Sequence, residues 1–154
     1  MKSYMLIVLT LFLSACTLFT LEAERLHVQV IQAIVDGDAM KSASFFSNSY
    51  IDFGDGAKSL DENYFNSVFA TDYYKNYLKG KKVEDLFDMN KKEVYNYRQI
   101  MRSKYKDYGK PHNFEFEKGD YLVFYPHKEG SGMYEGFIAV YRIIDGKFKI
   151  VAGD

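Results

Sequence analysis

Apolar residues recur at helical spacing over residues 21–36, and this pattern predicts the first helix of a folded domain. The stripe consists of Ala23, Leu26, Val30, Ala33 and Ile34, widened by Val28, Ile31 and Val35. Gly37 is a suitable stop, because glycine adopts the left-handed cap conformation without strain. Asp38 can then cap a short second helix that ends near Phe46. The domain is therefore expected to open with two helices.

The middle of the chain predicts one short strand and further helices. Residues 50–53 resemble a strand that Gly54-Asp55-Gly56 interrupts. Ser59-Leu60-Asp61-Glu62 fits a capping box, which predicts a helix over residues 59–78. Asn90 with Glu93 predicts another helix, running to about Tyr108, and residues 83–87 are expected to form at most one helical turn.

From Asn113 onward the apolar period changes from helical to alternating, which predicts an antiparallel meander. The expected strands cover residues 114–117, 121–125, 134–144 and 147–152. Asp145-Gly146 is a strong signal for a two-residue hairpin. Helices followed by such a meander give an α+β fold.

The Asp145-Gly146 turn fixes a register. It places Ile143 opposite Phe148, Tyr141 opposite Ile150 and Ala139 opposite Ala152. Arg142 then faces Lys149, a like-charge pair expected to lie in water. The expected core face consists of Phe137, Ala139, Tyr141, Ile143, Phe148 and Ile150. With a tight turn at Lys118-Gly119, a second shared face consists of Phe114, Phe116, Tyr121, Val123 and Tyr125.

Residues 1–15 have the pattern of an export signal, with a basic Lys2 and an apolar run that is too short to span a bilayer as a mature helix. Leu13-Ser14-Ala15-Cys16 follows and resembles the lipobox of bacterial lipoproteins. The resemblance implies cleavage before Cys16, acylation of that residue, and a membrane-anchored protein of the bacterial cell envelope. Thr17 after the cysteine resembles the pattern for sorting to the periplasmic face of the outer membrane in diderm bacteria. Residues 16–20 are then the lipidated cysteine and a short tether, and residues 21–154 a single domain.

Composition narrows the function classes. The 154 residues carry a formal charge of −1, which gives no reason to expect a nucleic-acid partner. A single cysteine excludes an internal disulfide and a cysteine-cluster zinc site. The three histidines are far apart in sequence, so no metal site and no cofactor is predicted. His27, at the edge of the first helical stripe, is expected to be a core-edge residue.

Two stretches resemble the nuclear transport factor 2-like (SnoaL-like) superfamily. The first, residues 28–56, combines an amphipathic helix, a Gly-Asp break, a Phe-Phe pair and a short strand. The second, residues 137–154, is similar to the closing hairpin of that superfamily, with Phe148 at its usual aromatic position. The resemblance implies an NTF2-like cone, in which N-terminal helices pack on a curved antiparallel sheet.

Enzymes of that superfamily carry out proton abstraction inside the cone, and the resemblance implies Asp52 or Asp55 as the base. Tyr125, Tyr134 or Tyr141 would donate a hydrogen bond to the developing enolate. An aspartate beside Gly-Asp-Gly is more typical of turn chemistry. We therefore expect a non-catalytic binding domain, and a ketosteroid-isomerase-like enzyme is the alternative.

The expected ligand is either a small apolar molecule or another envelope protein. A small molecule would occupy a pocket lined by Phe114, Phe116, Tyr125, Phe137 and Tyr141, with His127 at its mouth. A protein partner would bind exposed sheet residues such as Leu122 and Phe124, and a homodimer through the same face is a further expectation. Residues 91–110 carry a net charge of +5 with interleaved tyrosines, which favours a solvated helix face over a site for anionic lipid.

Overall fold

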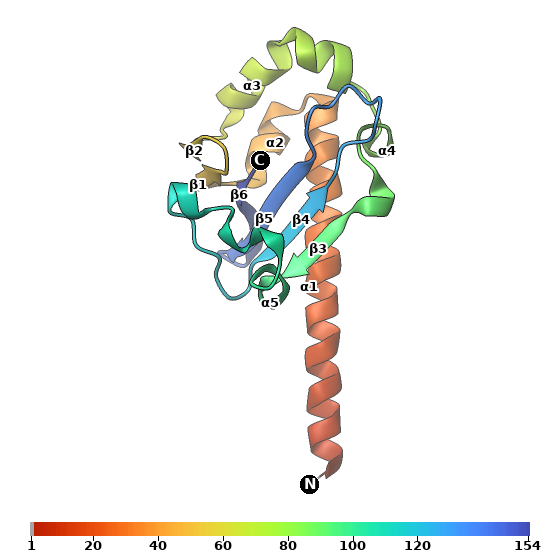
Figure 1. Ribbon diagram of the computed structural model, residues 1–154, viewed down its shortest axis with the longest axis vertical. Helices are drawn as coiled ribbons and strands as arrows, with labels where there is room; N and C mark the ends of the chain where they lie inside the picture. The colour runs from red at the N-terminus through yellow and green to blue at the C-terminus, as the bar shows by residue number, and fades with distance from the viewer. Residues whose placement is uncertain (1) are drawn as a thin grey trace.

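The structure is a computed structural model that describes the backbone of residues 2–154 and the side chains of residues 18–154. In the described chain one six-stranded sheet runs in the order β2-β1-β6-β5-β4-β3, and helical segments cover it (Figure 1). The strands are β1 (Phe46–Asp52), β2 (Gly56–Lys58), β3 (Glu93–Asn96), β4 (Tyr121–Tyr125), β5 (Phe137–Ile144) and β6 (Lys147–Gly153). The helical segments are α1 (Lys2–Asp36), α2 (Ala39–Ser44), α3 (Glu62–Ala70), the π-helix η1 (Tyr74–Leu78), α4 (Val83–Leu86), η2 (Met89–Lys91), α5 (Tyr97–Ile100), η3 (Lys104–Asp107) and η4 (Lys110–His112).

The α+β fold expected from the sequence, with N-terminal helices packed on a curved sheet, is confirmed. The pairing is antiparallel throughout except at the centre, where β1 runs parallel to β6. The sheet is therefore not a simple meander. The last strand in sequence lies between β1, far upstream, and β5, its hairpin partner.

Helix α1 ends at Asp36 as predicted, and Gly37 adopts a φ of 73°. It begins much earlier than residue 21 and includes residues 16–20, which the sequence suggests as a tether. One half of α1 packs along the sheet and the other half extends away from it (Figure 1). The side chain of Cys16 lies outside the described residues, so the predicted lipid attachment stays a prediction. Among the described residues, no helix is long and apolar enough to cross a bilayer.

The sheet buries side chains on both faces, because each face is covered. Residues of α1, including Val30, pack against Tyr125, Tyr141 and other inward residues of β4 and β5. The opposite face is covered by the segment from α5 to Phe114. That second cluster consists of Ile100, Tyr105, Phe114, Leu122, Ile138, Val140, Val151 and Ala152.

The prediction that Leu122 is exposed for recognition is wrong, since its side chain is 0 % exposed beneath this second cover. Phe124 is partly buried in the same cluster. The sheet face expected to bind a protein partner is thus occupied by this chain's own residues.

The predicted register of the last hairpin is confirmed from Ile144 opposite Lys147 to Tyr141 opposite Ile150. Beyond that point it shifts by one residue, and Ala139 pairs with Gly153 instead of Ala152. The extra residue in β6 is Val151, which forms a β-bulge and packs in the second cluster.

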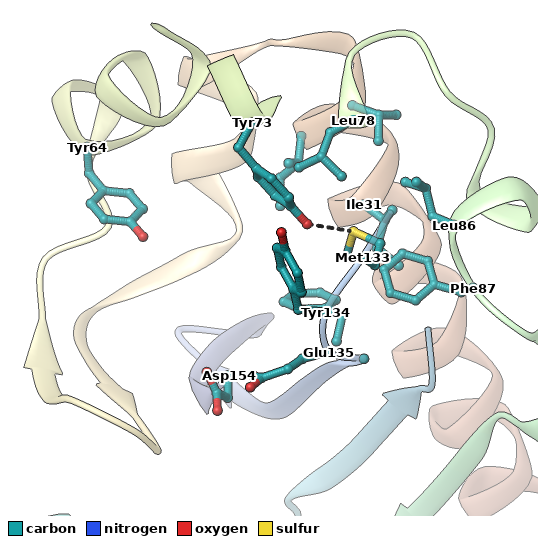
Figure 2. Close-up of a pocket in the computed structure, with 14 residues that line it drawn as sticks. Ile31, Tyr64, Tyr73, Leu78, Leu86, Phe87, Met133, Tyr134, Glu135 and Asp154 are labelled. Carbon is teal, nitrogen blue, oxygen red and sulfur yellow. Dashed lines mark hydrogen bonds between the residues drawn. The ribbon is translucent and has the colours of Figure 1, made fainter. Parts of the chain in front are cut away.

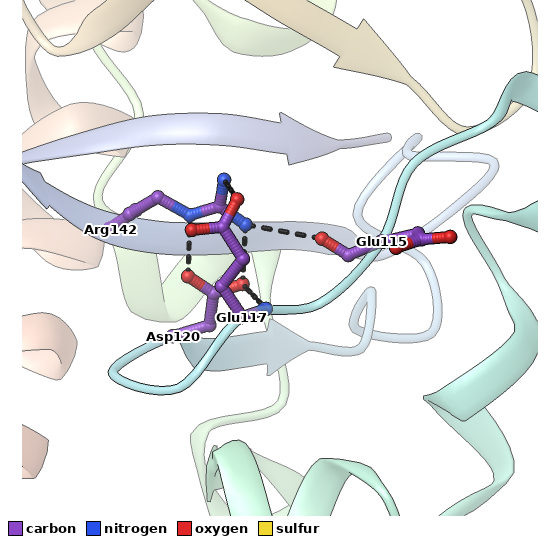
Figure 3. Close-up of polar contacts among 4 residues, drawn as sticks. All are labelled: Glu115, Glu117, Asp120 and Arg142. Carbon is purple, nitrogen blue, oxygen red and sulfur yellow. Dashed lines mark hydrogen bonds and ion pairs between the residues drawn. The ribbon is translucent and has the colours of Figure 1, made fainter.

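Two predictions about side chains of β5 are wrong. Arg142 does not face water: its guanidinium binds the buried carboxylate of Asp120 and also contacts Glu117 (Figure 3). Lys149 turns away from it and donates to the Ser44 carbonyl, which removes the like-charge contact. Ile143 is not in the core but 47 % exposed, because it lies beyond the part of the sheet that α1 covers fully.

The short helices show where local capping decides the boundaries. Asp38 caps α2 as predicted, accepting from the Lys41 backbone amide at 2.9 Å. The residue that caps α3 is Asp61 and not Ser59, since Asp61 Oδ1 accepts from the Tyr64 amide at 2.9 Å. The predicted helix over residues 59–78 therefore starts later and is divided between α3 and η1. The helical turn expected at residues 83–87 is confirmed as α4.

The single helix predicted from Asn90 to Tyr108 is wrong. Residues Glu93–Asn96 instead form β3, an edge strand paired with β4, with Val94 in one cluster and Tyr95 in the other. A capping box between Asn96 and Gln99 then starts α5. Tertiary pairing therefore overrides the helical pattern here.

The strand predicted over residues 114–117 is also absent from the described structure. Side chains hold this segment in place: the Glu117 amide donates to Asp120 Oδ2 at 2.8 Å, and Arg142 Nη2 donates to the Glu115 carbonyl at 3.2 Å (Figure 3). Phe114 and Phe116 consequently pack on the face of the sheet opposite to Tyr125.

Candidate functional site

A cavity of about 630 Å³ opens between α1, the α3–η1 region and the loop that precedes β5 (Figure 2). Its volume lies within the range of roughly 300 to 1,000 Å³ that is usual for small-molecule sites. The lining residues are Ile31, Ile34, Val35, Tyr64, Tyr73, Leu78, Leu86, Phe87, Met133, Tyr134, Glu135, Gly136, Phe137 and Asp154.

The inner wall of the cavity is apolar. Ile31, Ile34 and Val35 follow one another on the sheet-facing side of α1, at the spacing that brings helix side chains onto one face. Leu86 and Phe87, at the end of α4, face them and are almost fully buried. These side chains give a hydrophobic interior without a hydrogen-bonding group.

Aromatic side chains surround the mouth of the cavity. The rings of Tyr73 and Tyr134 stack with centroids 5.9 Å apart and planes inclined by 20°. The Tyr73 hydroxyl donates to the Gly132 carbonyl at 3.4 Å and contacts Met133 Sδ at 3.6 Å (Figure 2). Tyr64 comes from α3 on the other side, and Tyr134 is 83 % exposed. Ligand access at this mouth would pass between tyrosines.

Two carboxylates, Glu135 and Asp154, complete the lining, and Figure 2 shows them side by side. Among the described residues neither forms a salt bridge. Burial raises the pKa of Asp154, and the negative charges of Asp52 and Glu135 add to the effect. The mouth therefore has negative charge in addition to its aromatic surface.

Of the pocket residues predicted from the sequence, Phe137 lines this cavity, and Tyr125 and Tyr141 lie behind it. Both tyrosines are almost completely buried and surround His27, which sequence reasoning placed only at the edge of the core. His27 Nδ1 lies 2.9 Å from Tyr141 Oη, and its ring stacks on Phe137 with centroids 4.7 Å apart. Phe137 thus separates a packed polar cluster from the open cavity.

This cluster is a dry environment. Burial lowers the pKa of His27 to about 3, against a smaller opposing effect of the Phe137 backbone. Burial also raises the pKa of Tyr141 and of Tyr125, the latter with a further contribution from Glu24. His27 Nε2 and Tyr125 Oη have no hydrogen-bond partner among the described residues. All three groups are therefore held in their neutral forms near neutral pH.

The other predicted pocket residues are elsewhere. Phe114 and Phe116 pack against each other on the far face of the sheet, with centroids 5.2 Å apart, and cannot line a cavity with Tyr125. His127 is exposed, and its backbone forms a bridge with Phe87 after β4 has ended. The prediction that these six residues line one pocket is therefore wrong for five of them, and Phe137 alone of the six lines the cavity.

The two aspartates considered as catalytic bases do not line the cavity. Asp52 Oδ1 accepts from the amides of Gly54 and Asp55 at 2.9 and 2.8 Å, and Oδ2 binds Lys58 at 2.9 Å. Burial opposes ionisation, but these hydrogen bonds outweigh it and lower the pKa of Asp52. Asp55 has a side chain that is 73 % exposed and binds the same lysine. Both carboxylates have the turn and ion-pair roles typical of this motif.

Several cavity residues were not found from the sequence. Tyr64 and Tyr73 lie within a segment read as one regular helix, and Met133 and Glu135 lie in a glycine-rich loop with no periodic pattern. Of the aromatic lining residues, the sequence predicts Phe137 as a pocket residue and Tyr134 as a hydrogen-bond donor. The signal for Met133 and Glu135 is the density of aromatic residues on either side of Gly130 and Gly132, which adopt positive φ angles.

In the basic segment, residues 91–110, four of the seven cationic side chains form ion pairs with other described residues. Lys91 pairs with Asp88, Lys92 with Glu24, Lys104 with Glu93 and Lys110 with Asp107.

Among the described residues, no group of histidine, cysteine and carboxylate side chains is arranged to hold a metal ion. The chemistry of the site therefore comes from apolar, aromatic and carboxylate groups.

No known protein-family model matches this chain, and no curated protein matches it. A solved structure from Xanthomonas campestris, described as a calcium/calmodulin dependent protein kinase II association domain, is similar at 13 % identity. The alignment covers 86 % of this chain and 82 % of that chain, with a TM-score of 0.45.

Proposed function

We propose that this protein is a lipid-anchored lipoprotein of the bacterial cell envelope whose domain binds a small, largely apolar ligand. The cavity of about 630 Å³ between α1 and the loop before β5 is the observation that carries this proposal. Its interior presents aliphatic and aromatic side chains, which favour an apolar body by removing its surface from water. The few polar groups lie at the mouth, where they can orient a ligand.

The anchoring part of the proposal is supported by the residues that follow Cys16 along α1. Leu18, Phe19 and Leu21 are 65 %, 44 % and 57 % exposed, and Ile143 at the end of β5 is 47 % exposed. The ring of Phe19 lies 6.1 Å from that of Phe148 in the last hairpin, so these residues occupy one end of the domain. An exposed apolar end beside an acylated cysteine is suited to contact with a membrane surface.

Native mass spectrometry of the full-length protein, purified from membranes, tests the ligand. A stoichiometric added mass that is lost on denaturation is expected. Met133→Trp would fill the cavity and remove the added mass, whereas Met40→Trp, at a site on α2 that is 70 % exposed, would retain it. A clean mass without ligand, from protein extracted in polymer nanodiscs instead of detergent, would contradict the proposal and favour an envelope protein as the partner.

Replacement of the lipobox cysteine tests the anchor. Cys16→Ala is expected to leave the protein unprocessed or to release it from the membrane fraction. Ser3→Ala, which keeps Leu13-Ser14-Ala15-Cys16 intact, should be processed normally. Unchanged processing and membrane retention in Cys16→Ala would overturn this part of the proposal and leave the ligand part standing.

A further inference from the structure

The cavity that we propose as the ligand site has an unbalanced charge. Glu135 and Asp154 are the ionisable acids in its lining, and among the described lining residues there is no lysine, arginine or histidine. Asp52 and Asp55 lie close enough to influence Asp154, and the nearby cation, Lys58, is already bound to both of them. The ammonium group of Lys58 is thus shared by two aspartates outside the lining and does not balance the two acids inside it.

The aromatic residues at the same mouth add a second, independent feature. Tyr73 and Tyr134 stack on each other at the opening, and Tyr64 lines the cavity from α3 on the other side (Figure 2). Their π faces carry partial negative charge, and an ammonium group near such a face is attracted to it. Groups of tyrosines beside carboxylates bind quaternary ammonium ions in this way.

The inner wall of the cavity determines the chemistry of the part of the ligand that lies inside. Ile34, Leu86 and Phe87 offer only apolar surface, so a charge placed there would lose its hydration without compensation. A ligand that satisfies both regions has an apolar body inside and a positive charge at the mouth. From this juxtaposition we infer that the cavity selects cationic ligands, namely organic ammonium compounds with an apolar body. This inference rests on the proposed ligand site.

Burial and the neighbouring Asp52 and Glu135 charges raise the pKa of Asp154, which shows that the site disfavours a further negative charge. A bound ammonium group would offset that repulsion and lower the pKa again. Ligand binding should therefore release protons at pH values near that of the Asp154 titration.

Three probes with the same phenylmethyl body separate charge from shape: benzyltrimethylammonium, phenylmethanesulfonate and benzyl alcohol. Calorimetric titration of the full-length protein in nanodiscs, corrected with empty nanodiscs, should show the ammonium compound binding roughly tenfold more tightly than the alcohol. The sulfonate should bind most weakly. Equal affinities, or a preference for the sulfonate, would overturn the inference while leaving an apolar site in place. Failure of all three probes to bind would count against the proposed function as well.

Variants attribute the preference to particular groups. Glu135→Gln combined with Asp154→Asn should remove most of the ammonium preference, measured as the ratio of the affinities for benzyltrimethylammonium and benzyl alcohol. Asp145→Asn, an acid in the hairpin turn outside the cavity, is the matched control and should behave as the wild type. Tyr134→Leu should also reduce ammonium binding, whereas Tyr108→Leu, on the other side of the sheet, should not. A preference that survives in the double variant would contradict the role of the carboxylates.

Discussion

Arg142 and Asp120 form a two-point ion pair, with Nε 2.7 Å from Oδ1 and Nη2 2.8 Å from Oδ2. Asp120 is completely buried directly before β4, and Arg142 reaches it from the C-terminal half of β5. The same guanidinium donates to the Glu115 carbonyl, so the pair also fixes the segment that crosses the outer face of the sheet (Figure 3). One arginine therefore connects two neighbouring strands with the segment that packs on the outer face of the sheet.

Asp120→Ala is expected to destabilise the domain by about 3 kcal/mol, because it leaves a largely buried guanidinium without its main partner. Urea unfolding followed by circular dichroism measures this change. Asp107→Ala is the control: its ion pair with Lys110 is exposed, and its loss should cost less than about 1 kcal/mol. Similar costs for the two variants would show that the Arg142 pair has no special structural role.

Gly37→Ala should cost more than Gly80→Ala, although both glycines have φ angles near +70°. Each substitution carries a left-handed backbone penalty of about 1 kcal/mol. At Gly37 the new Cβ would also lie 2.7 Å from the Tyr74 hydroxyl and displace it from the Val35 carbonyl, to which it donates at 3.0 Å. Around Gly80 there is open space. We expect an additional loss of about 1 kcal/mol in Gly37→Ala, measured by thermal unfolding; equal losses would contradict it.

The cap of α3 provides a test between two neighbouring residues. Asp61→Ala should destabilise the domain by about 1 kcal/mol, because the Tyr64 amide loses its acceptor. Ser59→Ala should have little effect, since Ser59 is exposed and does not cap the helix. The reverse order in denaturant unfolding would indicate that the helix starts at the capping box suggested by the sequence.

The burial of His27 predicts that the folded domain loses stability at acid pH. The pKa of His27 falls to about 3 in the folded domain, so as the pH drops below about 6.5 the unfolded chain binds a proton that the folded chain does not. Stability should therefore decrease by up to about 1.4 kcal/mol per pH unit between pH 6.5 and 3 from this group alone. In NMR titrations the His27 ring should stay neutral throughout most of that range. Titration of His27 near pH 6.5 would rule out the dry cluster.

The sequence predicted those parts of the fold in which local chemistry decides the outcome. The end of α1 at Gly37, the cap at Asp38 and the Asp145-Gly146 hairpin depend on a few adjacent residues, and the structure confirms them. The helix predicted over residues 93–96 is wrong because their pairing partner is β4, 25 to 31 residues away along the chain.

The candidate site was harder to predict for the same reason. Phe137, Tyr125 and Tyr141 alternate along strands, so their shared face could be recognised. Tyr73 and Met133 meet only through the folded loop before β5, and nothing in either segment specifies the other. The sequence places His27 at the edge of the core, because the apolar stripe indicates only which side of the helix this residue occupies. The pattern does not indicate which side chains of the sheet pack over that side.

The parallel contact between β1 and β6 has a consequence for how the chain acquires its structure. These strands pair residues roughly 100 positions apart, and β6 connects the β1–β2 ribbon to the other half of the sheet. Until residues 147–153 have emerged from the ribosome, the two halves have no strand to join them. The nascent chain thus keeps its sheet open until β6 is available, and closure of the sheet should be a slow step in folding.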